Sequence, residues 1–199
     1  MMLIEETTLP QAALPISQFR EHLRLGSGFS DDGLQDPVLE SYLRAAIAAI
    51  EARTGKILIE RQFSWTLTEW RNAVEQPLPL APVNMILEVV LMDGEGGETV
   101  VDRALWRLVP DMQRPAIAAQ GSCLPTIPQN GAARLRLLVG FGPDWGDLPA
   151  DLGQAVLMLA AYYYEHRHEV ALGGAGLPYS VNALIERYRA IRLSAGGAS

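Results

Sequence analysis

The feature that most constrains the fold of this chain is a change of hydrophobic period along it. Apolar residues recur every three or four positions up to about residue 56 and again from about residue 149, which is the period of helices that bury one face. Between these blocks apolar and polar residues alternate, and Pro and Gly are frequent, as in strands joined by turns. The sequence therefore predicts an α+β fold in which a β-rich insertion separates the second helix from the third.

Four helices are expected, forming a small bundle. The second has the clearest ends, because Pro37 suits a first helical position and Gly55 suits the position after the last turn. The last carries Val181, Leu184 and Ile185 at helical spacing. The predicted helices span residues 17–25, 37–54, 149–168 and 180–193.

The middle of the chain predicts strands and turns. Three prolines between Gln76 and Val83 exclude a helix there. The Gly-rich turn Asp93–Gly97 predicts a hairpin, and residues 113–131 read as irregular. The predicted strands span residues 63–68, 85–92, 99–101, 106–109 and 134–139.

These elements suggest a discontinuous domain. We expect residues 1–56 and 148–199 to form one helical domain, and residues 57–147 to form an inserted β-rich region. Residues 194–199 are all Ser, Ala or Gly. Such small side chains offer little to pack, so we expect a flexible tail there.

Composition narrows the possible partners. The net charge of −7 disfavours non-specific DNA binding, which needs many basic groups, although an acidic wall would let DNA pass without adhering. Cys123 is the only cysteine, which suits a reducing compartment. The start does not resemble a signal peptide, and the longest apolar run, Ala155–Tyr164, is too short to span a bilayer. We therefore expect a protein made in the cytosol and not bound to membranes.

No catalytic, cofactor or metal site is predicted, so the expected role is not enzymatic. His166 and His168 are two positions apart, and on a helix such residues project in different directions, which argues against a shared metal ion. Asp144, Asp147 and Asp151 crowd a helix start, where negative charge favours the helix dipole. A small hydrolase that uses Asp144, Asp147 or His166 is an alternative that the sequence leaves open.

Two surfaces are candidates for contacts between subunits. Tyr162 and Tyr164 flank a residue of the buried stripe, so they pack either within the subunit or against a partner. Arg44 and Ala45 lie on the second helix, whose many alanines would allow close packing on more than one neighbour. The alternative is that alanine is present only as a good helix former.

Several short segments, in their order and spacing, resemble the head–tail connector proteins, or adaptors, of long-tailed phages and gene transfer agents. The long β-rich middle is similar to the larger subtype of that family, which has an inserted β domain. The matching segments are FREHLRL at Phe19–Leu25, the helix Leu39–Gly55, LPLAPV at Leu78–Val83, LVGFG at Leu138–Gly142 followed by Leu148–Pro149, YYEHR at Tyr163–Arg167 and the closing helix Pro178–Tyr188.

The resemblance implies a structural protein at the neck between capsid and tail. Such adaptors form a ring of about twelve copies, a closed head-to-tail assembly, under the capsid portal. DNA passes through the ring without specific binding, and the stopper, or head-closure protein, docks below. A stopper or another neck or tail assembly protein is the alternative. The family's C-terminal segment engages the portal, and by position this role falls on Val181, Leu184, Arg187, Tyr188, Arg189, Ile191, Arg192 and Leu193.

Overall fold

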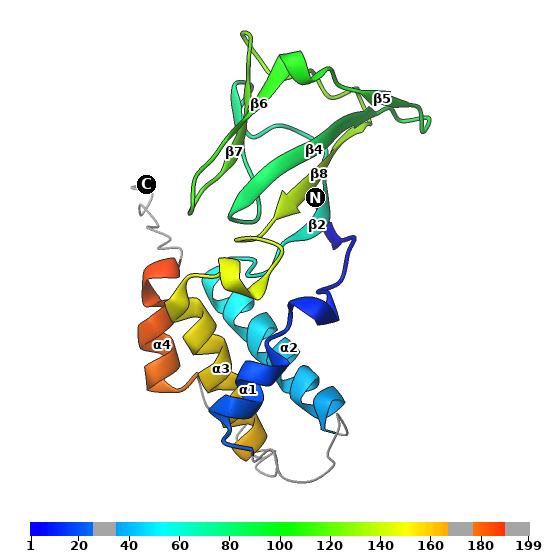
Figure 1. Ribbon diagram of the computed structural model, residues 1–199. Coiled ribbons are helices and arrows are strands. Elements are labelled where there is room, and N and C mark those ends of the chain that lie inside the picture. The colour runs from blue at the N-terminus through cyan, green and yellow to red at the C-terminus, as the bar shows by residue number, and fades with distance from the viewer. Residues whose placement is uncertain (26–34, 167–176, 190–199) are drawn as a thin grey trace, which may run out of the picture. The chain divides into compact units, whose positions relative to one another are not determined.

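The computed structural model describes residues 1–25, 35–166 and 177–189. The chain divides into two compact units (Figure 1). The β unit contains Met1–Pro15 and Lys56–Pro149, and the helical unit contains Ile16–Gly55 and the described residues after Pro149. This is the α+β architecture predicted from the change of period, with the strand-rich segment between the second and third helices.

The described part of the helical unit contains a helix at each of the four predicted places. They are α1 (Ile16–His22), α2 (Asp36–Thr54), α3 (Ala150–Glu165) and α4 (Tyr179–Ile185), and the last continues into the 3-10 turn η4 (Glu186–Tyr188). Helix α4 is shorter than the predicted span 180–193, because it ends at Ile185 and Arg189 is extended. Helix α2 has proline in its first turn and ends at Gly55, whose φ of 69° is left-handed and whose N–H donates to the carbonyl of Glu51. Both ends of α2 are therefore set by the residues that predicted them.

The apolar stripes of these helices form the core of the helical unit. Helix α3 contacts α2 and α4, and the short α1 contacts both α2 and α3. An ion pair between Arg20 of α1 and Asp36 at the start of α2 also joins these two helices. The fully buried side chains include Phe19, Leu39, Leu43, Ile50, Leu152, Val156, Leu159, Val181 and Ile185.

The β unit contains two antiparallel sheets. The larger has five strands in the order β1-β2-β8-β4-β5, and the smaller has three in the order β3-β7-β6 (Figure 1). The strands are β1 (Met2–Glu5), β2 (Arg61–Leu67), β3 (Glu75–Pro77), β4 (Val83–Met92), β5 (Glu98–Val100), β6 (Trp106–Val109), β7 (Ala116–Ala119) and β8 (Ala132–Val139).

Strand β8 is the middle strand of the larger sheet. It pairs with β2 along one side and with β4 along the other. Ala133, Leu135, Leu137 and Val139 alternate along it and are fully buried, as the two-residue period predicted. Trp65 lies opposite Leu135 in the register with β2, and side chains of the smaller sheet, such as Ile117, belong to the same hydrophobic core.

Three strands, β1, β3 and β7, were not predicted. Strand β3 overlaps the proline-rich segment from Gln76 to Val83, for which we expected only that it is not a helix. Strand β7 lies inside the segment 113–131 that we expected to be irregular, so that expectation was wrong there. Its sequence, AIAA, is rich in alanine, which has a low intrinsic preference for strands, and it is ordered by pairing with β3 and β6. Strand β1 is also unexpected, and it places residues 1–15 in the β unit, whereas we had grouped them with the helices.

Glycine is required where β8 ends. Gly140 has a φ of +145°, and a Cβ atom there would lie 2.5 Å from the backbone of Glu60. Its N–H donates to the carbonyl of Pro82, and the N–H of Phe141 donates to the carbonyl of Leu58. The Gly-Phe-Gly turn that the sequence marked as a strand end therefore holds three chain segments of the β unit together.

Replacing Leu135 by alanine should destabilise the β unit by about 3 kcal/mol, because the cavity would open in the middle strand of a packed core. All four tryptophans, Trp65, Trp70, Trp106 and Trp145, belong to this unit, so urea unfolding followed by tryptophan fluorescence reports on it. Leu138→Ala is the matched control, since Leu138 is only half-buried on the other face of β8. Equal losses for both variants would contradict the assigned core face.

Candidate functional site

The residues predicted to bind the portal differ in their accessibility. Val181 and Tyr188 are buried, and Leu184 is half-buried. Arg187 and Arg189 are exposed. Ile191, Arg192 and Leu193 lie outside the described residues, as does the predicted tail 194–199. The described part of this surface is therefore a buried stripe with two arginines beside it.

Two of these residues bind the start of α3. The hydroxyl of Tyr188 donates to Oδ1 of Asp151 at 2.7 Å, and Nε of Arg187 lies 2.9 Å from Oδ2 of the same carboxylate. Arg187 also donates to the Tyr188 hydroxyl and places its guanidinium 4.7 Å from the centre of the Tyr188 ring. We call these three residues the Asp151 clamp. It holds the last described turn of the chain against α3.

Electrostatics support the neutral form of Tyr188 in this clamp. Burial raises the pKa of its hydroxyl, and this outweighs the hydrogen bond from Arg187, which lowers it. The neutral hydroxyl can then donate to the carboxylate of Asp151. The Arg187–Asp151 pair is more exposed on its arginine side, so the buried tyrosine is the more important partner for stability.

The tyrosines proposed for subunit contacts also make contacts within the helical unit. The ring of Tyr164 meets Tyr42 of α2 edge to face, with centroids 5.9 Å apart. The ring of Tyr162 stacks on His166 at 4.2 Å. Both tyrosines are half-buried. One of the two alternatives, packing within the subunit, is therefore present, and a partner contact through their remaining surface stays a prediction.

The other proposed contact residues lie on α2. Arg44 pairs with Glu40 at 2.8 Å and is partly exposed, while Ala45 is exposed. Glu40 and Arg44 are four positions apart on the helix, a spacing at which oppositely charged side chains meet. Because it is exposed, Ala45 is available on the surface of α2, and a contact between subunits through Arg44 and Ala45 stays a prediction.

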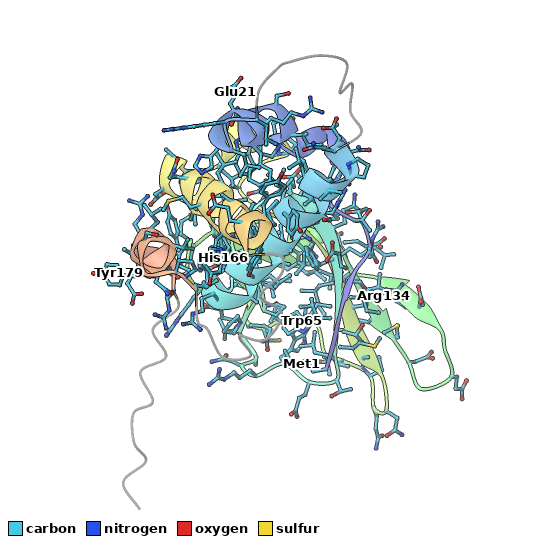
Figure 2. The ribbon with its side chains drawn as sticks, turned by 90° about the horizontal axis from the view of Figure 1, so that it is seen from below. Met1, Glu21, Trp65, Arg134, His166 and Tyr179 are labelled. Carbon is cyan, nitrogen blue, oxygen red and sulfur yellow. The ribbon has the colours of Figure 1, made fainter. Side chains whose placement is uncertain are left out.

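A shallow groove of about 290 Å³ lies in the helical unit. His22 of α1, Tyr162 of α3 and Val181 of α4 are among its lining residues. Beside it, Tyr179 is 89% exposed, and Figure 2 shows it pointing away from the helices. This unit therefore presents both a groove and a protruding aromatic side chain near the start of α4.

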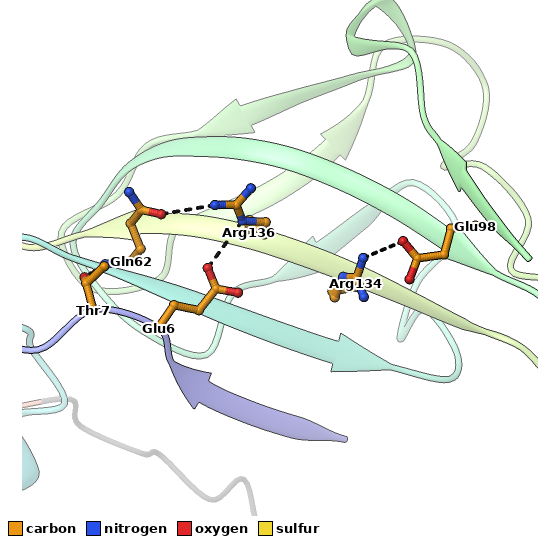
Figure 3. Close-up of polar contacts among 6 residues, drawn as sticks. All are labelled: Glu6, Thr7, Gln62, Glu98, Arg134 and Arg136. Carbon is orange, nitrogen blue, oxygen red and sulfur yellow. Dashed lines mark hydrogen bonds and ion pairs between the residues drawn. The ribbon is translucent and has the colours of Figure 1, made fainter. Parts of the chain in front are cut away.

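The larger sheet has a polar outer face, opposite its core face, with two arginines of β8 at its centre (Figure 3). Arg136 lies 3.3 Å from Glu6, which follows β1, and donates to Gln62 of β2 at 3.2 Å. Arg134 lies 2.7 Å from Glu98 of β5. The two side chains thus reach in opposite directions, each across an intervening strand, to the two edges of the sheet.

The residues considered for catalysis have structural partners. A carboxylate oxygen of Asp147 accepts from the backbone N–H of Asp144 at 2.9 Å, and Nδ1 of His166 lies 2.9 Å from the carbonyl of Tyr162. Asp144 and Asp147 belong to the β unit and His166 belongs to the helical unit.

Lys56, the only lysine, is buried. Burial lowers the pKa of its ammonium group, and the negative charge of Asp111 opposes that shift.

Three further features concern metal binding, the single cysteine and membrane-spanning segments. Within the described ranges, no group of three His, Cys, Asp or Glu side chains is placed to hold a metal ion. Cys123 is a free, exposed thiol. None of the helices in the described segments has the length and apolar character needed to cross a bilayer. His168 lies outside the described residues.

Solved structures similar to this chain come from gene transfer agent (GTA) particles, and two of three such structures are of the neck. A chain in the neck of an empty GTA particle, computed with C6 symmetry, is 54% identical, with a TM-score of 0.90 and coverage of 98% of this chain and 99% of that chain. A chain in the virion of a native gene transfer agent (GTA) particle is 54% identical with a TM-score of 0.87, and one in a native GTA neck computed with C12 symmetry is 50% identical with a TM-score of 0.84. Both have the same coverage as the first. No protein-family model and no curated protein matches the sequence.

Removing the hydroxyl of Tyr188 should weaken the Asp151 clamp. Tyr188→Phe is expected to destabilise the helical unit by about 1 kcal/mol, because it deletes a partly buried hydrogen bond to a carboxylate. Urea unfolding followed by the helical circular dichroism signal measures this. Tyr179→Phe is the control, since that side chain is 89% exposed and should change nothing.

The pH dependence of the stability of wild type and of Tyr188→Phe gives a second test. Because the pKa of Tyr188 is raised in the folded state, its contribution is complete below the unfolded tyrosine pKa of about 10 and is lost as pH rises through the higher folded value. The difference in unfolding free energy between wild type and Tyr188→Phe should therefore shrink at alkaline pH. A difference that grows with pH would contradict the assigned direction of donation.

Proposed function

This chain belongs to the neck proteins of gene transfer agent particles, a phage-like head–tail connector family, and we propose that it is the adaptor that joins the capsid portal to the next neck component. Its role is structural, as a subunit of the neck between head and tail. The observation that carries the assignment is similarity over nearly the whole of both chains at 54% identity. Such coverage includes the β unit as well as the helices.

A ring of copies follows from the symmetry of the related necks. Those structures were computed with sixfold and twelvefold symmetry, and rings with such rotational symmetry use head-to-tail contacts between identical subunits. We propose about twelve copies in this chain's ring, as the resemblance implies for adaptors. The net charge of −7 supports a channel that DNA traverses without specific binding.

We propose that the helical unit is the connector domain and that the portal contact lies at its C-terminal end. The Asp151 clamp supports this, because it holds Arg187 and Tyr188 against the start of α3 and so positions Arg189, the last described residue. Arg187 and Arg189 are exposed beside that point, and Arg192 follows in the sequence. Arg187 and Arg189 bind Asp151 and Glu186 of the same subunit, both at 2.9 Å. Exposed ion pairs of this kind are weak, so these arginines can also bind carboxylates of an acidic partner surface.

The proposed partners on the two sides of the ring are the portal and the stopper. A stopper role for this chain itself is the alternative, and the two roles differ in which neighbour is touched. The chemistry-bearing residues Asp144, Asp147 and His166 have structural partners, which supports a role without catalysis. Electron microscopy of particles that carry a tag on this chain would separate an adaptor, in contact with the portal, from a stopper placed below it.

The C-terminal contact can be tested by ending the chain after Arg189. The cut spares Val181, Ile185 and Tyr188, which are buried in the helical unit; removing residues 181–199 would take core side chains with it. The shortened protein should unfold at the same urea concentration as the full chain but should no longer cosediment with tailless capsids. Attachment that survives the truncation would contradict the portal contact.

A charge-matched control accompanies the truncation. The removed segment contains one charged residue, Arg192, so Arg53→Ala removes the same charge from an exposed position at the end of α2. This control should keep full capsid attachment. Equal loss in both proteins would assign the effect to overall charge and not to the C-terminal segment.

A further inference from the structure

We propose that the two edges of the five-stranded sheet are the surfaces through which neighbouring copies meet in the ring, the β1 edge of one copy against the β5 edge of the next. This inference rests on the proposed function, because it needs a ring of identical subunits. It assigns the inserted β unit a role that the proposed portal contact leaves open. Both edges belong to one unit and one sheet.

The β1 edge exposes an unusual amount of apolar surface. Met2 is 56% exposed and Ile4 is 46% exposed, and Leu3, on the opposite face of the strand, is also exposed. Natural sheet edges usually carry charges, proline or bulges that prevent association. Three of the four residues of β1 are apolar, and the strand has no proline and no bulge against β2. Its one charged residue, Glu5, binds Arg61 of the same subunit. An edge of this kind is suited to being covered by another chain.

This edge is held firmly in place. Strand β1 pairs with β2 in regular antiparallel register, and the buried Arg61 binds Glu5 at 2.8 Å. Beyond the strand, the N–H of Glu6 donates to the carbonyl of Gln62, and the N–H of Gln62 donates to the hydroxyl of Thr7 at 2.9 Å. The apolar side chains of β1 are therefore presented on an ordered strand, which lowers the entropy cost of binding.

The opposite edge is also exposed and apolar at its end. Strand β5 pairs only with the end of β4 in the larger sheet, and Val100 is 65% exposed. Val100 lies opposite Val90, and Val90 lies opposite Arg134, so it shares the outer face with Arg134. Met2 and Ile4 share that face too, since they lie opposite Thr66 and Ser64 of β2.

Ion pairs within the subunit reduce the charge at both edges, which favours an apolar contact between them. Three carboxylates at these edges, Glu5, Glu6 and Glu98, already bind Arg61, Arg136 and Arg134 of the same subunit. Their charge is thus compensated, and two such edges can approach without strong repulsion. The edges differ from each other and lie on opposite sides of the sheet, which is the arrangement that a closed head-to-tail ring requires.

Cysteine crosslinking in assembled particles tests the contact. In a Cys123→Ser background, which removes the only native thiol, Ile4→Cys and Val100→Cys are combined in one chain. Purified particles are treated with a short bismaleimide and separated by denaturing electrophoresis. The double variant should give a ladder of dimers, trimers and higher multiples, because each copy links to two neighbours. Each single variant should give monomers only.

A matched control uses Ile4→Cys with Val74→Cys, because Val74 is 52% exposed in the same unit but outside both edges. It should give no ladder. Particles that contain the Ile4–Val100 double variant but yield no ladder would overturn the proposed contact, as would dimers from Ile4→Cys alone, which indicate a symmetric contact. Absence of the unaltered chain from particles would contradict the proposed function instead.

A charge variant gives a second measurement. Ile4→Glu should reduce incorporation into particles about tenfold, because it places an unpaired carboxylate in an apolar contact. Its unfolding by tryptophan fluorescence should be unchanged, since the side chain is half exposed in the free subunit. Val74→Glu is the control and should incorporate normally. Normal incorporation of Ile4→Glu would overturn the proposal.

Discussion

The β unit depends on the alternation of side chains along β8. One face of this strand is a row of fully buried apolar residues, and the other carries Arg134 and Arg136. The buried row joins both sheets into one core, while each arginine reaches across a neighbouring strand to an edge of the sheet. A single strand thus supplies the hydrophobic interaction that holds the unit together and the ion pairs that neutralise its edges. The proposed ring contact relies on both.

In the helical unit, the contact of most interest positions the last described turn of the chain. Its core is made by apolar side chains of all four helices, and in addition Asp151 at the start of α3 binds both Tyr188 and Arg187. Such a contact orients the last described turn without contributing much apolar area. If the portal is bound by the residues that follow, the clamp limits the directions in which they can leave the subunit, and this reduces the entropy lost on docking.

Polar groups that could suggest chemistry serve structure in this protein. Asp147 caps a turn, His166 lies against the carbonyl and ring of Tyr162, and Asp151 holds the clamp. Each of these residues stabilises a particular backbone or side-chain position within its own unit. This arrangement fits a protein that acts by contacts with its neighbours, in agreement with the neck particles in which its relatives are found.

The sequence by itself determined the order of the four helices, five of the eight strands in the described residues, the ends of α2 and the buried face of β8. These depend on local periodicity and on residues such as Pro37 and Gly55. The order and spacing of short segments likewise carried the resemblance to neck connectors. Only the tertiary structure decided the place of β1 and β7, which have weak local preferences and are ordered by pairing with distant strands. It also brought Tyr188 to Asp151 and Tyr164 to Tyr42. No periodic pattern encodes such contacts, because they join side chains that are far apart along the chain and meet only once the elements have packed.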